Sequence, residues 1–189
     1  MRQIIYSVNL TLDGFMEGPD HELDWTVVEE ELHTFFNDQE QKVDTHLYGR
    51  RMYETMKYWE TADANPSSSA VELEYARIWK NKSKIVFSKT LERVEGNARL
   101  VRDDIVNVIE SLKAQPGKDM YVGGAEIASS LRRLGWIDEY WLFVHPVVLG
   151  RGKPAFPAMD GSINLRLAET RTFRSGVVFL RYQQADRGQ

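Results

Sequence analysis

The sequence contains no cysteine. This absence excludes disulfide bonds, thiolate nucleophiles and thiolate metal ligands within the chain, and it fits a reducing compartment. Positive charge is not in excess either, because 24 lysines and arginines stand against 28 aspartates and glutamates, a formal net charge of −4. Such a chain lacks the broad positive footprint of nucleic-acid-binding proteins. We therefore expect no nucleic-acid partner, and a bound anion must meet a local cluster of cations and backbone N–H groups.

Long hydrophobic runs and metal-binding patterns are missing as well. No apolar run approaches the roughly 20 residues that span a bilayer, and residues 1–8 become polar too soon for a signal peptide. We therefore expect no membrane partner and a cytoplasmic location. The four histidines show no paired ligand spacing, so we expect no metal site; they are His21, His33, His46 and His145.

What the sequence does contain is an ordinary globular composition, with 42% hydrophobic and 28% charged residues. A chain of 189 residues is long enough to bury a core without disulfides or metals. Neither an internal repeat nor a long linker interrupts it. We therefore expect a single domain over residues 1–189.

Short apolar runs alternate with segments of helical periodicity along the chain. The predicted strands cover residues 4–10, 44–49, 84–88, 98–102, 119–122, 137–144, 166–173 and 177–182. The predicted helices cover residues 22–42, 50–56, 71–79, 103–114 and 125–134. We expect the first of these helices to begin near Asp24, with Asp24 as its N-cap. This alternation predicts an α/β fold with a mostly parallel sheet covered on both faces. The tight turn at residues 174–176 predicts an antiparallel hairpin of the last two strands at one edge.

The predicted strand that ends at Gly49 is followed by residues suited to an anion. In an open α/β sheet, ligands gather at the carboxyl ends of the strands. Gly49 lets the backbone approach a ligand closely, and Arg50 and Arg51 offer cationic groups that suit phosphate. The alternative is a plain strand-to-helix turn with solvated arginines.

Two further strand ends carry similar signals. Ser88 and Thr90 flank Lys89 directly after a buried strand, which suits a phosphate monoester, although a polar loop would look the same. Gly123 and Gly124 stand between a strand and a helix, where a pyrophosphate can lie against bare backbone at the helix N-terminus. The diglycine matches neither the G-x-G-x-x-G fingerprint nor the P-loop. The three ends together are stronger evidence than any one of them.

Taken in chain order, these segments resemble the dihydrofolate reductase superfamily over nearly the whole chain. The first strand with residues 13–15 resembles the opening strand and flexible active-site loop of the family, and Trp25 resembles the tryptophan before the substrate-side helix. Residues 48–54 resemble the helix start that holds cofactor phosphate, residues 87–90 the loop for the adenosine phosphate, and residues 122–126 the turn over the pyrophosphate.

The segment of residues 145–156 resembles the C-terminal reductase domain of the bifunctional riboflavin enzymes and its stand-alone relatives. The resemblance implies a three-layer α/β/α fold and an NADPH-dependent reductase of the 5-amino-6-(5-phosphoribosylamino)uracil type, or of a related pyrimidine or pterin. Phe143 stands where a folate reductase usually has a threonine, and no zinc motif of a deaminase precedes the domain. There are two alternatives: the protein has dihydrofolate reductase activity, or it is a nucleotide-binding module without turnover.

The resemblance also implies which residues form the sites. The expected cofactor-binding residues are Val8, Asn9, Gly14, Gly49, Arg50, Arg51, Met52, Ser88, Lys89, Thr90, Gly123, Gly124, Ala125 and Glu126. The cations among them favour NADPH over NADH, because the 2′-phosphate needs positive charge. A reduction also needs a proton, and a partly buried carboxylate with a raised pKa is the usual donor. Glu30 and Asp13 are the catalytic candidates, with Glu31 as the alternative to Glu30 and water as the alternative to any side chain.

The final hairpin predicts a homodimer. Its apolar residues are Leu165, Leu167, Phe173, Val177, Val178, Phe179 and Leu180, and the preceding segment adds Trp136, Trp141, Phe143 and Val144. Exposed apolar edge strands are a liability that proteins cover or pair. The riboflavin-type resemblance implies pairing through this side of the sheet. The alternative is that these residues fill the core of the monomer.

Overall fold

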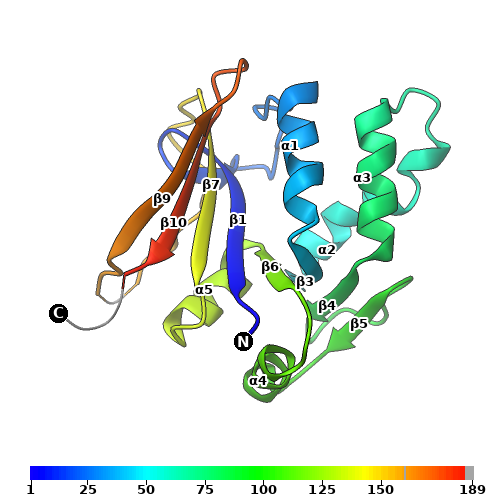
Figure 1. Cartoon of the computed structure of the whole chain (residues 1–189), viewed down its shortest axis with the longest axis vertical. Coiled ribbons are helices and arrows are strands. Elements are labelled where there is room, and N and C mark those ends of the chain that lie inside the picture. The colour runs from blue at the N-terminus through cyan, green and yellow to red at the C-terminus, as the bar shows by residue number, and fades with distance from the viewer. Residues whose placement is uncertain (160, 186–189) are drawn as a thin grey trace.

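The computed structural model describes residues 1–159 and 161–185, and its centre is an eight-stranded sheet. The strand order is β5-β4-β3-β6-β1-β7-β10-β9 (Figure 1). The strands are β1 Ile4–Thr11, β3 Val43–Gly49, β4 Ser83–Phe87, β5 Ala98–Val101, β6 Asp119–Gly123, β7 Glu139–His145, β9 Leu165–Thr172 and β10 Val178–Gln184. From β5 to β7 each neighbouring pair is parallel. β10 is antiparallel to both β7 and β9, so the predicted edge hairpin is confirmed.

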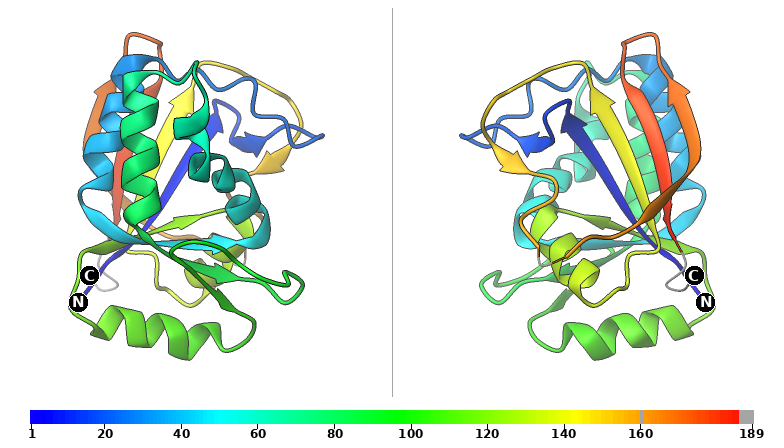
Figure 2. Two further views of the ribbon diagram at one scale, coloured as in Figure 1. Left: turned by 90° about the vertical axis from the view of Figure 1, so that its right-hand side faces the viewer. Right: turned by 90° about the vertical axis from the view of Figure 1, so that its left-hand side faces the viewer.

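Helices cover both faces of this sheet, which gives the predicted dihydrofolate-reductase-like α/β fold. They are α1 Glu30–Glu40, α2 Arg50–Met56, α3 Ala70–Asn81, α4 Ile105–Ala114 and α5 Ala125–Arg133, with 3₁₀ turns η1 Lys57–Glu60 and η2 Ala62–Ala64. α4 and α5 pack on one face around β1 and β6. α1 packs on the other face, and α3 lies beside it (Figure 2). β1 is the central strand, paired with β6 on one side and β7 on the other.

The start of the first helix differs from the expectation. The helix begins at Glu30 with Glu29 as N-cap, not near Asp24, and it ends at Glu40. The apolar residues that suggested an earlier start do not face the core; they are Leu23, Val27 and Val28, each about two-fifths exposed. The Val27 N–H donates to Nδ1 of His145, 3.2 Å away, rather than to a helical carbonyl.

Two very short strands were not predicted. β2 Phe15–Glu17 and β8 Lys153–Pro154 form a separate antiparallel sheet. Strands of three and two residues are too short to show a hydrophobic period. This small sheet brings the segment after β1 next to the segment after β7, and Ala155 N–H donates to Gly14 O over 2.9 Å.

The apolar residues of the closing strands lie mostly inside this chain. Phe173, Val177 and Phe179 are buried, and Phe35 lies 5.3 and 5.1 Å from the rings of Phe173 and Phe179. Trp141 and Phe143 belong to the same core. These five residues therefore fill the core of the monomer and take no part in a pairing surface, as the alternative had it. What remains outside is β9, which is exposed along its whole length.

No helix among residues 1–159 and 161–185 is long and apolar enough to cross a membrane.

Candidate functional site

A cleft of about 1480 Å³ opens at the carboxyl ends of the central parallel strands. Asn9 of β1, Gly49 of β3, Phe87 of β4 and Gly123 of β6 all line it. This is the edge where an open α/β sheet gathers its ligands. From there the cleft continues between α1 and α3, where His33 and Tyr75 line it.

The first wall is the start of α2. Gly49 is the N-cap of this helix, and no side chain caps it. A Cβ on Gly49 would meet nothing within 4 Å, so the backbone borders open space. Arg50 reaches the next strand end, where its Nη1 donates to Thr90 Oγ1 over 3.4 Å. Arg51 instead forms an ion pair with Glu17 of β2.

The second wall is the diglycine between β6 and α5. Gly124 is the N-cap of α5 at φ +101°, a conformation that L side chains rarely adopt, and no side chain caps this helix either. A Cβ on Gly123 would lie 3.1 Å from atoms of Met52 and Tyr48, so β6 approaches α2 and β3 closely. Glu126 in the first turn pairs with Lys153 of β8 over 3.0 Å, and this hydrogen bond lowers the pKa of Glu126.

The third wall is the loop after β4. Ser88 Oγ accepts hydrogen bonds from the N–H groups of Thr90 and Leu91, which closes the loop on itself. Arg102, at the end of β5, donates to Lys89 O over 3.3 Å. The Lys89 ammonium is largely exposed, and its nearest anion is Asp103 at 3.7 Å. Arg102 lines the cleft but was not predicted; the available signal was an arginine at a strand end directly before a helix start.

The structure brings thirteen of the fourteen expected cofactor residues to this one cleft. They are Val8, Asn9, Gly49, Arg50, Arg51, Met52, Ser88, Lys89, Thr90, Gly123, Gly124, Ala125 and Glu126. Gly14 is the exception, because it lies in the turn between β1 and β2 and contacts Ala155. A single extended ligand could therefore touch all three strand ends.

The expected catalytic carboxylates do not line the cleft. Glu30 lies exposed in the first turn of α1, so the expectation of a partly buried group there is wrong. Glu31 accepts a hydrogen bond from the Arg174 N–H, which lowers its pKa. Asp13 accepts hydrogen bonds from Thr11 Oγ1, which lowers its pKa most, and from the N–H of Gly150. A lowered pKa opposes proton donation near neutral pH.

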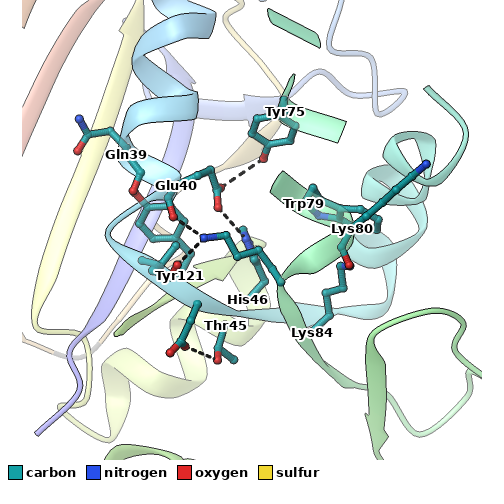
Figure 3. Close-up of polar contacts among 12 residues, drawn as sticks. Gln39, Glu40, Thr45, His46, Tyr75, Trp79, Lys80, Lys84 and Tyr121 are labelled. Carbon is teal, nitrogen blue, oxygen red and sulfur yellow. Dashed lines mark hydrogen bonds and ion pairs between the residues drawn. The ribbon is translucent and has the colours of Figure 1, made fainter. Parts of the chain in front are cut away.

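A buried carboxylate does line the cleft, but it is Glu40 at the other end of α1 (Figure 3). One oxygen lies 3.1 Å from His46 Nε2 and the other accepts from the Tyr75 hydroxyl over 3.4 Å. The Tyr48 hydroxyl lies 2.8 Å from His46 Nδ1, and burial raises the pKa of Tyr48. The available signal was that His46 and Tyr48, two residues apart in a predicted strand, must share one face of it.

At the end of β1, a histidine orients the Asn9 side chain. His145 is fully buried, and desolvation lowers its pKa to about 4. Its Nδ1 accepts from Val27 N–H and its Nε2 lies 3.0 Å from Asn9 Oδ1. The neutral imidazole with the proton on Nε2 satisfies both contacts. This bond holds the amide of Asn9 at the cleft.

Within the described part of the chain, no group of three or more histidine, aspartate or glutamate side chains could hold a metal ion.

Comparison with known proteins places the chain in one family. The family model described as RibD C-terminal domain matches residues 2–179, and this chain belongs to that family. The chain is 38% identical over 182 residues to the uncharacterized protein YyaP of Bacillus subtilis (strain 168). The aligned region covers 96% of this chain and 94% of YyaP.

Two solved structures share the fold. A protein from Shewanella sp. PV-4, assigned to riboflavin biosynthesis, superposes with a TM-score of 0.77 at 20% identity, over 98% of this chain and 100% of the other. Dihydrofolate reductase from Enterococcus faecalis, complexed with NADP(H) and RAB-propyl, superposes with a TM-score of 0.65 at 16% identity, over 97% of both chains. At sequence identities this low, the likeness to both structures shows a shared fold and nothing further.

Proposed function

We propose that this protein is a reductase that transfers a hydride from NADPH to a small heterocyclic substrate. The observation that carries the proposal is the convergence of three anion-friendly strand ends, at Gly49, Ser88 and Gly123, on one cleft. Membership of the RibD C-terminal domain family supports it. So does the NADP(H) bound by the Enterococcus faecalis enzyme of the same fold.

The pyrophosphate of the cofactor is proposed to lie at the diglycine. Helix N-termini attract anions through free N–H groups and the helix dipole, and no side chain occupies that position at Gly124. The open space at Gly49 is the second argument for fit, since any side chain there would enter the cleft. Arg51 lies close enough to lower the pKa of Glu126, so its charge belongs to the same end of the cleft.

The 2′-phosphate is proposed to lie at the loop after β4. Arg50 and Thr90 are already in contact there, and Lys89 and Arg102 add two further cations. A hydrogen bond to a charged group contributes roughly 1.5–3 kcal/mol, and the exposure of Lys89 places its share at the lower end.

When bound, NADPH would supply the hydride, and the protein would orient the rings and exclude water. Val8 and Asn9 are proposed to flank the nicotinamide, with Asn9 held by His145. Because Glu30 and Asp13 lie outside the cleft, their placement favours solvent as the source of the proton. A nucleotide-binding module without turnover remains the second candidate, since Phe143 replaces the threonine of folate reductases.

Calorimetric titrations with NADPH and with NADH test the proposal. We expect NADPH to bind in the micromolar range, and Gly124→Ala to weaken binding because the new side chain strains the backbone at the cleft. Gly161→Ala is the matched control: its φ is also positive, at +91°, but Gly161 does not line the cleft. Absence of NADPH binding at about 1 mM would overturn the proposal.

A further inference from the structure

We propose that the end of the cleft between α1 and α3 binds a flat aromatic ring that is uncharged or cationic and carries no phosphate. We call this end the aromatic chamber; its lining residues are His33, Phe36, Glu40, His46, Trp59, Glu72, Tyr75, Tyr121 and Phe143. The inference rests on the proposed function, because the ring would be the hydride acceptor. It departs from the phosphoribosyl substrate that the resemblance implies.

One wall of the chamber is a ring of aromatic side chains between α1 and α3. His33 of α1 lies 5.9 Å from the Trp59 ring and 5.6 Å from the Tyr75 ring, and Trp59 and Tyr75 are 4.6 Å apart. These rings meet edge to face or tilted, and Trp59 and Tyr75 are only partly buried. Partly exposed aromatic faces in a cleft are surfaces on which a planar ligand can stack.

The opposite wall is the sheet, and it connects the chamber to the proposed nicotinamide position. Phe143 of β7 lies 4.8 Å from Phe36, and Tyr121 of β6 lies 5.9 Å from His46. Phe143 is also the register partner of Asn9 in the pairing of β7 with β1. A ring in the chamber would therefore lie next to the strand end where we place the nicotinamide.

The charge of the chamber argues against phosphate. Among the described residues that line it, the charged side chains are Glu40 and Glu72, with no lysine or arginine. Lys82 lies close to Glu40, but its Nζ donates to the carbonyls of Glu40 and Val43 and it does not line the cleft. A phosphate dianion next to two carboxylates would be repelled, and more strongly where water is excluded.

The cations of the cleft lie elsewhere. They are Arg50, Arg51, Lys89, Arg102 and Lys153, at the α2 start, the loop after β4, the end of β5 and β8. Their hydrogen-bond and ion-pair partners also lie at that end, and bound NADPH would occupy it. A substrate phosphate would then have neither chamber cations nor free cofactor-side cations to meet.

The chamber also contains a polar atom that lacks a partner. His33 is buried, and its Nδ1 has no hydrogen-bond partner among residues 1–159 and 161–185. Buried polar atoms are nearly always satisfied, by protein, water or ligand. A ring nitrogen or an amino group of a heteroaromatic ligand would satisfy it. His46 is not available for this purpose, because Glu40 and Tyr48 contact both of its nitrogens.

Two matched pairs of probes test the inference: riboflavin with its 5′-phosphate, and thiamine with its monophosphate. Each pair differs only in the phosphate. Binding is measured by fluorescence, with NADP⁺ saturating so that the cofactor-side cations are covered. We expect the unphosphorylated member of at least one pair to bind about tenfold tighter or more than its phosphate. Equal or tighter binding of the phosphates, or no binding of any probe up to about 1 mM, would overturn the inference.

Variants identify the residues responsible. Glu40→Gln and Glu72→Gln should each narrow the preference for the unphosphorylated probe, because each removes a negative charge from the chamber. Asp38→Asn, on the exposed side of the same helix as Glu40, is the matched control and should leave the ratio unchanged. Since Glu40→Gln could impair folding, Trp59→Leu is a second route: it should weaken both members of a pair equally. An unchanged ratio in both glutamate variants would contradict the charge argument.

The two proposals fail separately. Gly124→Ala should weaken NADP⁺ without changing probe binding to the chamber. If the protein binds a probe but does not bind NADPH, the proposed function is overturned and the proposal about the aromatic chamber stands. If the protein binds NADPH tightly but prefers the phosphorylated probes, the proposal about the aromatic chamber is overturned and the proposed reductase function stands.

Discussion

The imidazole of His145 lies with Nε2 3.0 Å from Oδ1 of Asn9, and this contact joins two neighbouring strands at the mouth of the cleft. His145 is completely buried and its Nδ1 accepts the N–H of Val27. A protonated ring could not accept that hydrogen bond, because both of its nitrogens would carry protons. The geometry at the end of β1 therefore depends on a neutral histidine.

This dependence predicts a loss of stability in acid. Desolvation lowers the pKa of His145 from 6.5 to about 4. The unfolded state then binds more protons than the folded state between these values, so the free energy of unfolding should fall by up to about 3 kcal/mol as the pH drops from 6.5 to 4. Urea unfolding over this pH range measures it. In His145→Gln this part of the pH slope should disappear, and an unchanged slope would contradict the assignment.

The second prediction concerns cofactor choice. The double variant Arg50→Ala, Lys89→Ala should weaken NADPH about tenfold or more, with a much smaller effect on NADH, because both cations flank the proposed 2′-phosphate site. Arg51→Ala should weaken both cofactors alike, since Arg51 lies near Glu126 at the diglycine. Kd values from calorimetry decide between these outcomes. Arg77→Ala, exposed on α3, is the control. Equal losses for both cofactors in the double variant would show that the phosphate lies elsewhere.

A third prediction concerns a buried ion pair at the far end of β7. Burial alone would raise the pKa of Glu139, but hydrogen bonds from Arg181, Gln183 and Trp141 outweigh it and lower the pKa. Arg181 donates two hydrogen bonds of 2.7 Å to this carboxylate. Arg181→Met should cost about 3 kcal/mol, because removing one partner leaves a buried charge unpaired. Urea unfolding near pH 7 measures the loss.

The control for this pair is Arg99→Met on β5, an exposed arginine on the opposite edge of the sheet. Surface substitutions usually stay within about 0.5 kcal/mol. If Arg181→Met were as mild as this control, the ion pair would contribute little to stability.

The fourth prediction is a homodimer through β9. This edge strand is exposed along its length, including Leu165 and Leu167. Most soluble homo-oligomers are two-fold dimers, and pairing of two copies of β9 would cover both unpaired edges. Sedimentation should give twice the 21.9 kDa of one chain. Leu165→Lys with Leu167→Lys should return the mass to one chain, whereas Leu134→Lys, exposed after α5, should not. A single-chain mass for the unaltered protein would end this prediction.

The parts of the fold that follow from local pattern could be predicted. The parallel strands are short apolar runs with polar or glycine ends, and the glycines at residues 49 and 123–124 marked the strand ends that line the cleft. The start of α1 could not be predicted in the same way. Val27 and Val28 fit a helical period but remain exposed, because the contact of Val27 with His145 spans 118 residues.

The substrate end of the cleft was harder to predict than the cofactor end. The cofactor end is built from contiguous motifs, whereas Glu40 meets His46 and Tyr75 only because α1, β3 and α3 pack together. The resemblance pointed to the first turn of α1 and to Glu30. The buried carboxylate that lines the cleft, Glu40, lies in the last turn of the same helix, ten residues later in the sequence.

The small sheet of β2 and β8 has a consequence for how ionic strength acts on this protein. Each of its two strands has one charged side chain that forms an ion pair with a residue at the start of a helix. Glu17 of β2 pairs with Arg51 of α2, and Lys153 of β8 pairs with Glu126 of α5. An incoming anion must compete with Glu17 for Arg51. Added salt screens this competition as well as the attraction of the anion. The salt dependence of nucleotide affinity should therefore be shallower than five cleft-lining lysines and arginines would suggest, because Arg51 and Lys153 are already paired with carboxylates of the same chain.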